Sequence, residues 1–283
     1  MEMRSQSPVM QYTVKTFIFI IVFTLIFTCV RLVDDGNLVT VQMEELGGIP
    51  WLYSVIGLVF SILSGFIIQK QWENWQKLHD AILSEASSLN KIWLMAKHSS
   101  ESDATIIRVL IKKYLAHVIH NEWQKKELYV NTERGEKFVF EMNEILIESA
   151  RKSATNSYSL DLVAELYEKR LKRLLLMSHQ LPAVLDRIIM FNAYMLISLS
   201  LFIGVKNFYL DYLFTLGIGI LIYVIQLIIK DLSEVTLPGA WYVEPSQFQL
   251  LLERFKNEES RGDGVSKNHA NDIDSFQAEP GNG

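Results

Sequence analysis

The stretch that most constrains this chain runs from Ile49 to Ile68, twenty residues without a formal charge. At the rise of an α-helix it spans about 30 Å, the thickness of the hydrocarbon core of a bilayer. From Phe66 to Leu78 no proline or glycine interrupts the polar, tryptophan-rich sequence that follows. We therefore predict one helix over residues 49–78 that crosses a membrane and continues into the cytosol.

Three further apolar runs predict membrane helices. One covers residues 13–33, and two 18-residue uncharged runs, Ile188–Val205 and Tyr212–Ile229, are joined by a link short enough for an antiparallel hairpin. Hydrophobic residues make up 49% of the chain, and the net charge of −5 argues against nucleic acid as a partner. The predicted class is an all-α integral membrane protein with four transmembrane helices and a large helical cytosolic insert between the second and third.

The chain divides into eight predicted segments. In order, they are an N-terminal cytosolic arm (1–12), membrane helix 1 (13–33), an outer acidic loop (34–48), membrane helix 2 with its cytosolic extension (49–78), a cytosolic helical domain (79–185), the hairpin of membrane helices 3 and 4 (186–230), a cytosolic return segment with a short helix (231–256) and a disordered tail (257–283). Lysine and arginine flank mainly one side of the spans, and only Arg31 and Lys206 flank the other. The positive-inside rule then places both termini in the cytoplasm.

Two stripes of residues four apart run along the second membrane helix. One is an apolar ridge, Leu58, Ile62 and Phe66; the other is a stripe of small residues, Gly57, Ser61 and Gly65. The ridge has two interpretations, a hydrophobic constriction in a pore or ordinary packing against helices of the same subunit. The small residues are expected to let neighbouring helices approach closely.

Polar residues follow on the same helix below the membrane. Lys70 and Lys77 are seven residues apart and so share one face. Facing a vestibule, they would raise the local concentration of anions; alternatively, they fix the topology and contact lipid headgroups. Gln69 offers a neutral hydrogen-bond donor to an anion.

The cytosolic domain contains no predicted metal or catalytic site. His117 and His120 share a helix face, but no third ligand is evident, which favours a hydrated or core histidine pair. No nucleophile motif or phosphate-binding loop occurs, so we expect no enzyme and no cofactor. A turn is expected at 132–137, and the basic run Lys169–Arg173 is expected to contact lipid or to pair with Glu165 and Glu168. The leucines predicted to face inward on the last helix of this domain are Leu162, Leu166, Leu171, Leu174 and Leu175.

Local motifs in this order resemble those of bestrophins. The segment GLVFSILSGFIIQKQWENWQKL is similar to their second membrane helix, with Gly65-Phe66 and Trp75 matching and Asn74 standing where the family has arginine. A bacterial bestrophin-like domain family is still more similar. Its features match the segment EKRLKRLLLMSHQLP (Glu168–Pro182), Asp231, Pro238-Gly239 and the Val243-x-Pro245-x-x-Phe248 piece.

The resemblance implies a homo-oligomeric channel, a pentamer in a bacterial inner membrane that passes small inorganic anions. The three neck positions of the family match Leu58, Ile62 and Phe66. The calcium site of eukaryotic bestrophins is not carried over, because only Asp231 and Glu234 stand at a comparable place. The alternative is a non-conducting membrane scaffold or sensor whose cytosolic helices bind a partner.

Overall fold

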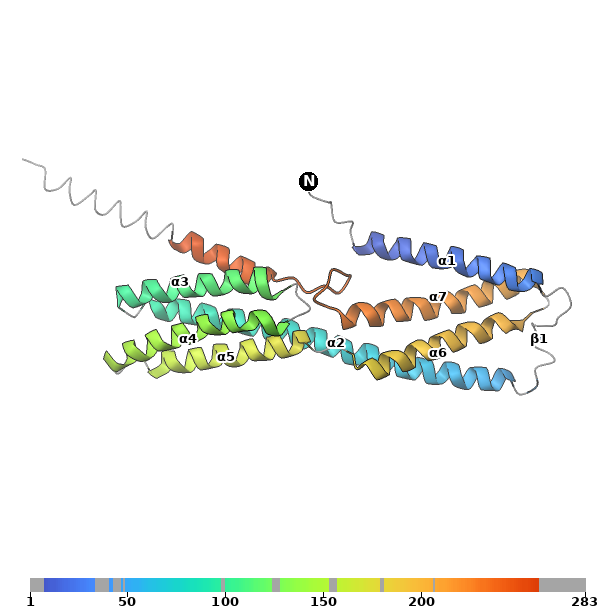
Figure 1. Cartoon of the computed structure of the whole chain (residues 1–283), viewed down its shortest axis with the longest axis horizontal. Helices are drawn as coiled ribbons and strands as arrows, with labels where there is room; N and C mark the ends of the chain where they lie inside the picture. Colours follow the sequence, from blue (N-terminus) through green and yellow to red (C-terminus); the bar gives the residue numbers. More distant parts are fainter. Residues whose placement is uncertain are drawn as a thin grey trace, which may run out of the picture. The chain divides into compact units, whose positions relative to one another are not determined.

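A computed structural model describes residues 8–33, 41–42, 47, 49–97, 100–123, 128–152, 157–178, 181–205 and 207–259. Nearly all of these residues are helical (Figure 1). The helices are α1 (Pro8–Val33), α2 (Ile49–Ala96), α3 (Glu101–His117), α4 (Leu128–Lys152), α5 (Ser157–Ser178), α6 (Ala183–Phe202), α7 (Phe208–Ser233) and a last helix over 246–259. A π-helical turn, η1 (Val118–Glu122), continues α3, and the short strands β1 (Val41–Gln42) and β2 (Ile203–Gly204) pair in parallel.

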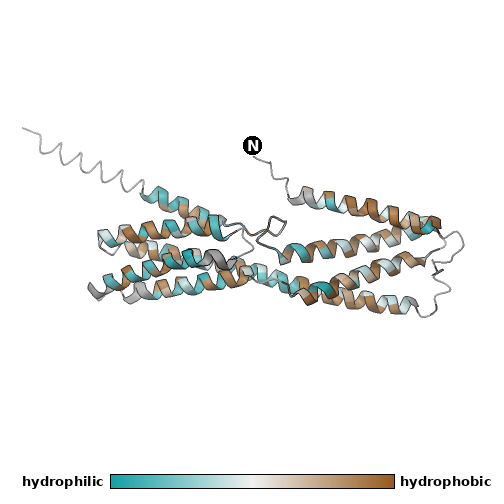
Figure 2. Cartoon of the chain, viewed as in Figure 1, coloured by the Kyte–Doolittle hydropathy of each residue, from teal (hydrophilic) through white to brown (hydrophobic). Residues whose placement is uncertain are grey.

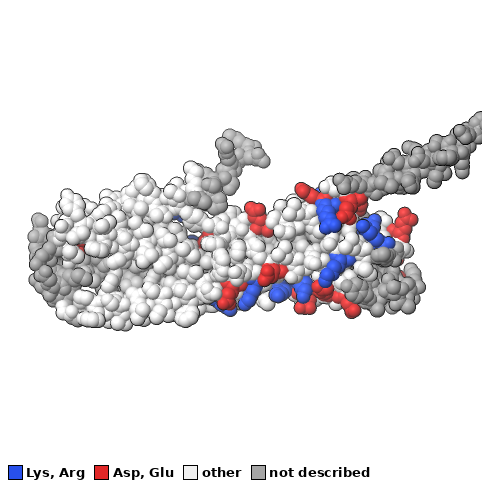
Figure 3. All heavy atoms as spheres, turned by 180° about the vertical axis from the view of Figure 1, so that it is seen from behind, with Lys and Arg blue, Asp and Glu red and all other residues white. Residues whose placement is uncertain are grey.

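The chain forms two compact units that share α2. The first, the apolar unit, comprises residues 1–77 and 179–243; the second, the charged unit, comprises residues 78–178 and 244–283. Apolar residues dominate α1, α6 and α7, whereas polar and apolar residues alternate along α3, α4 and α5 (Figure 2). On the face in Figure 3 the Lys, Arg, Asp and Glu side chains gather over the charged unit.

The described residues contain four stretches that are long and apolar enough to cross a membrane. They are Tyr12–Val33, Pro50–Ala96, Asp161–Phe202 and Phe208–Ser233. In the third stretch the apolar part is α6, since α5 carries many charges. The class that the sequence predicts, an all-α membrane protein with a helical insert between its second and third spans, is confirmed.

α2 is longer than the sequence analysis predicts, because it continues to Ala96 instead of ending near residue 78. No proline or glycine interrupts it after Gly65. Beyond Lys77 its apolar residues repeat at helical spacing and are buried, as Leu78, Ile82 and Leu89 illustrate. One continuous helix therefore contributes to both units.

Other predicted boundaries also shift. α1 begins at Pro8, not at residue 13, since proline suits the first helical position. α6 begins directly after Pro182, α7 ends at Ser233 and the last helix reaches residue 259. The predicted tail beyond residue 259, most of the acidic loop 34–48 and residues 1–7 lie outside the described residues.

The core of the apolar unit joins one face of α2 to α6 and α7. Its fully buried members are Phe60, Ile67, Ile189, Ala193, Leu196, Ile222 and Ile229. α1 packs closely on α7, where a Cβ on Gly219 would lie 3.0 Å from the ring of Phe23. Near the end of α1, Arg31 forms a 2.7 Å ion pair with Asp211 of α7 and donates to the carbonyl of Ile203.

Candidate functional site

The apolar ridge of α2 is not covered by the rest of its own chain. The side chains of Leu58, Ile62 and Phe66 are 61%, 49% and 71% exposed, whereas Phe60 and Ile67 on the opposite face are 3% and 8% exposed. The difference follows from helix geometry, because residues 60 and 67 point to α6 and α7 while the ridge points away from them. The residues that the structure describes thus leave about half or more of each ridge side chain exposed, and the role of the ridge as a pore constriction stays a prediction.

The stripe of small residues next to the ridge is also open. Ser61 and Gly65 are exposed, and a Cβ added at Gly57 or Gly65 would meet no atom within 4 Å. By contrast, a Cβ at Gly219 would press on a phenylalanine ring. Close helix contact at Gly57, Ser61 and Gly65 therefore stays a prediction about contacts with another copy of the chain.

Gln69, Lys70 and Lys77 are exposed on the same helix below the ridge. Between the two lysines lies Glu73, whose carboxylate is 3.9 Å from Nζ of Lys70 and 3.8 Å from Nζ of Lys77. Glu73 is not among the predicted site residues, although its spacing of three and four residues from the lysines is the usual signal for helix ion pairs. The three side chains together carry one net positive charge instead of two.

An aromatic cluster fixes the segment that follows α7. Trp72 and Trp75 stack with ring centroids 5.1 Å apart, and Trp241 meets both rings edge-on. Trp75 Nε1 also donates to the carbonyl of Trp241 over 3.0 Å. The tryptophan of the bestrophin-like motif thus ties the segment 234–243 to α2 within the apolar unit.

Asp231 is engaged by hydrogen bonds. Its carboxylate accepts from the backbone N–H groups of Ala240 and Trp241 at 2.9 and 3.2 Å and from the hydroxyl of Tyr12. This explains why an aspartate precedes the Pro-Gly turn, since it satisfies the backbone of that turn. Among the described residues there is no cluster of three or more His, Cys, Asp or Glu side chains that could hold a metal ion.

The charged unit contains a buried ionic cluster that the sequence analysis did not predict. Arg173 donates to Glu85 at 2.7 Å and to Glu122 at 2.9 Å, while Arg170 donates to Glu122 at 2.6 and 3.1 Å. Tyr114 donates its hydroxyl hydrogen to Glu85 and accepts from Arg170. The four charged side chains are nearly inaccessible and balance one another, as buried charges must.

Two expectations about α5 are therefore correct only in part, since Leu162 and Leu166 are buried as predicted whereas other members of both sets are not placed as expected. Arg170 and Arg173 pair with Glu122 and Glu85 inside the charged unit, whereas Lys169 of the same run lies 3.8 Å from Glu168. Leu171 and Leu175 are exposed, and the buried positions are 162, 163, 166, 170, 173 and 177. The spacing of the buried positions follows the helical period and could be predicted from the sequence. The pairing of the two arginines with Glu85 of α2 and Glu122 of η1 could not, because it depends on which elements pack against α5.

The predicted turn at 132–137 is also wrong, because these residues lie inside α4. Gly135 of α4 lies directly against the ionic cluster, and a Cβ there would be 2.5 Å from Nη2 of Arg170. The glycine is needed for close approach rather than for a turn. His117 lies nearby, buried, with its Nε2 3.6 Å from Glu122, as a core histidine.

The arginines of the cluster favour the charged form of the Glu122 carboxylate. Burial alone would raise the pKa of Glu122, but the guanidiniums of Arg173 and Arg170 outweigh burial and lower it. Burial and the charge of Glu85 raise the pKa of Tyr114, so its hydroxyl stays a donor. The cluster is thus two ion pairs bridged by a neutral phenol.

The fold and the uncovered membrane-length helix define the class, a helical integral membrane protein with a large charged insert. Comparison with family models identifies it more closely: a model described as Bestrophin-like domain matches residues 17–234. The chain belongs to the bestrophin-like family.

Solved structures give the same fold. Crystal structures of a bacterial bestrophin homologue from Klebsiella pneumoniae superpose with TM-scores of 0.70 and 0.68 at 11% and 12% identity. The first alignment covers 86% of this chain and 98% of the homologue, the second 85% and 99%. A further structure of the homologue aligns with a TM-score of 0.70 at 11% identity, over 85% of this chain and 97% of that one. Comparison with curated proteins found no significant match.

Proposed function

We propose that this chain is the subunit of an ion channel that conducts small monovalent anions through an oligomeric pore lined by α2. The observation that carries the proposal is the uncharged ridge of Leu58, Ile62 and Phe66, which stands uncovered on a helix long enough to cross a bilayer. Membership of the bestrophin-like family supports the same function.

The chemistry of the ridge suits a constriction in such a pore. Apolar side chains around an axis offer no hydrogen bonds, so they favour weakly hydrated ions and can gate by dewetting. Below them, Lys70, Glu73 and Lys77 add one net positive charge per chain at the entrance. A ring of such sites would raise the local concentration of anions over cations.

Reconstitution of the purified chain into vesicles tests conduction, and Phe66→Ala tests the ridge. Widening the proposed apolar neck at Phe66 should raise the single-channel conductance. Phe191→Ala is the matched control, because Phe191 on α6 is similarly exposed, at 67%, but lies off α2. Vesicles that pass potassium better than chloride would exclude the anion selectivity, and equal currents from wild type and Phe66→Ala would exclude the ridge.

The remaining parts of the proposal concern assembly and location. We propose a homo-pentamer in the bacterial inner membrane with both termini in the cytoplasm and the bilayer and its own copies as partners. Electron microscopy down the membrane normal should show five copies around an axial hole. A monomer or dimer without a central path, carrying no current, would instead support the non-conducting scaffold or sensor.

A further inference from the structure

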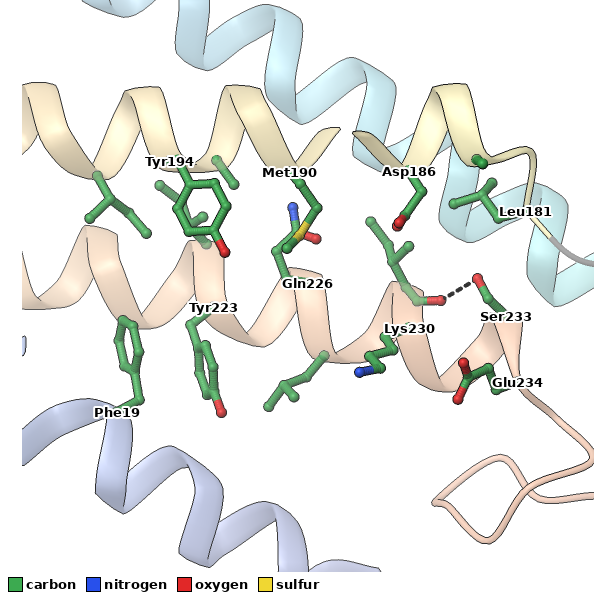
Figure 4. Close-up of a pocket in the computed structure, with 16 residues that line it drawn as sticks. Phe19, Leu181, Asp186, Met190, Tyr194, Tyr223, Gln226, Lys230, Ser233 and Glu234 are labelled. Atoms are coloured by element: carbon green, nitrogen blue, oxygen red, sulfur yellow. Dashed lines mark hydrogen bonds between the residues drawn. The ribbon is translucent and has the colours of Figure 1, made fainter. Parts of the chain in front are cut away.

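The apolar unit contains a cavity of about 620 Å³ that is lined by residues of α1, α6 and α7. Figure 4 shows Asp186, Met190 and Gln226 between α6 and α7, and Phe19 and Tyr223 between α7 and α1. The volume falls in the range of roughly 300–1,000 Å³ typical of small-molecule sites. None of the residues proposed to line the pore borders it.

The inner part of the cavity is apolar. Ala193, Ile197, Ile222 and Ile229 contribute aliphatic side chains, and the stacked rings of Phe19 and Tyr223, 4.2 Å apart, form the wall on the side of α1. Gln226 lies at the floor, where its amide is used in a 3.3 Å hydrogen bond to the carbonyl of Ile189. This part suits a hydrocarbon chain, which asks for no hydrogen bonds.

One end of the cavity is charged. Asp186 lies in the first turn of α6, Lys230 in the last turn of α7, and Glu234 follows α7 directly. All three side chains are exposed, and none forms an ion pair with a residue that the structure describes. The helix dipoles favour the acid Asp186 near the start of α6 and the base Lys230 near the end of α7.

We propose that this cavity binds a phospholipid of the surrounding membrane whose headgroup carries a phosphate and a primary ammonium, of the phosphatidylethanolamine type. Lys230 pairs with the phosphate, Asp186 and Glu234 accept hydrogen bonds from the ammonium, and one acyl chain fills the apolar part. The two carboxylates disfavour a headgroup that is only anionic. A quaternary ammonium, as in phosphatidylcholine, has no N–H to donate to them.

This inference goes beyond ion conduction and does not depend on it, so its test measures lipid binding. The full chain is extracted from vesicles made of equal parts of phosphatidylethanolamine, phosphatidylglycerol and phosphatidylcholine, and the lipid that stays bound is counted by mass spectrometry. We expect phosphatidylethanolamine to be enriched. Lys230→Gln should lower the enrichment by about tenfold, the effect of one charge-assisted hydrogen bond.

Arg187→Gln is the matched control. Arg187 is a basic residue at the same end of α6, exposed, with its Nε directed to the carbonyl of Ala183, and it does not line the cavity. Its loss should leave lipid enrichment unchanged. Met190→Trp, which fills the cavity without altering charge, should lower the total bound lipid, and an elution volume like that of wild type shows that each variant is folded.

Three outcomes overturn the proposal. The first is equal retention of the three lipids by the wild-type chain. The second is an equal effect of Lys230→Gln and Arg187→Gln, which would reduce the interaction to general charge at the interface. The third is a photo-cross-link from position 194, beside the cavity, to a second copy of this chain, which would show that a neighbouring subunit fills the space.

Discussion

Arg170 and Arg173 occupy helix positions that would ordinarily bury carbon. They follow Leu162 and Leu166 on the inner face of α5 and are 1% and 0% exposed. Removing a charge from water is costly, so a buried arginine persists only where carboxylates and further hydrogen bonds replace its hydration. Glu85 and Glu122 meet that condition from α2 and η1.

Arg173→Met should therefore destabilise the chain strongly, because Glu85 loses its ion-pair partner and Glu122 loses one of two. The expected loss in the free energy of unfolding is about 3–5 kcal/mol, measured by chemical or thermal unfolding in detergent. Lys172→Met, at the exposed neighbouring position, should change stability by less than about 0.5 kcal/mol. Similar effects from the two variants would show that the ion pairs contribute little.

The lowered pKa of Glu122 predicts how stability depends on pH. Because the pKa is lower in the folded than in the unfolded chain, the stabilisation is complete above the unfolded pKa and disappears as the pH falls through the folded one. Glu122→Gln should lower stability at neutral pH and flatten its decline toward about pH 3. Glu253→Gln, at an exposed position, should show the same decline of stability with falling pH as the wild type. If Glu122→Gln also shows this decline, Glu122 is not its cause.

At the scale of elements, α4 illustrates how a helix adapts to a neighbour. Gly135 lowers the helix propensity of α4, yet it leaves the space that the Glu122–Arg170 pair occupies. α2 shows the opposite case, since a Cβ at Gly57 or Gly65 would meet no atom of the described residues within 4 Å. The structural role of a glycine in a helix can therefore be assigned only when the element that faces it is known.

Gly135→Ala should destabilise the chain, although alanine normally stabilises a helix interior by about 1 kcal/mol over glycine. Its Cβ would press on Arg170 and Glu122, and overpacking of this kind costs about 1–3 kcal/mol. Gly217→Ala on α7, where a Cβ meets nothing within 4 Å, should be neutral or stabilising. The measurement is the unfolding midpoint of each variant relative to the wild type. A Gly135→Ala variant as stable as the wild type would mean that the ionic cluster can move aside.

At the scale of the whole molecule, the charged residues below the ridge bear on ion selection. Copies of α2 around an axis would form a ring in which each chain contributes Lys70, Glu73 and Lys77, with Glu73 offsetting one of its two lysines. The sign of this ring decides which ions are concentrated at the mouth.

Glu73→Gln should therefore raise the preference for anions, because each chain loses one negative charge at the entrance. In a chloride gradient the reversal potential should move toward the chloride equilibrium potential, and the shift should shrink at high salt as charges are screened. Glu101→Gln, at an exposed position at the start of α3, should leave it unchanged. No shift, or a shift toward cations, would show that α2 does not line the path below the ridge.

Much of the fold was predictable from local patterns. Charge-free runs indicated the spans, and motif order around Gly65-Phe66, Trp75 and Asp231 pointed to the family. The candidate site was less predictable. The pairing of Glu73 with both lysines follows from local helix spacing. The exposure of Leu58 and Phe66 and the burial of Arg170 instead depend on which residues from distant parts of the chain arrive at each face.

The sequence alone determined that this chain is a helical membrane protein, because the cost of placing charges and unpaired backbone groups in hydrocarbon leaves few alternatives for long uncharged runs. Only the tertiary structure decided which face of α2 stays uncovered, which arginines are buried and why Gly135 is a glycine. The exposed face of α2 is set by the packing of its other face on α6 and α7, and the buried arginines and Gly135 by contacts between α2, α4, η1 and α5. A pattern within one helix does not specify these partners.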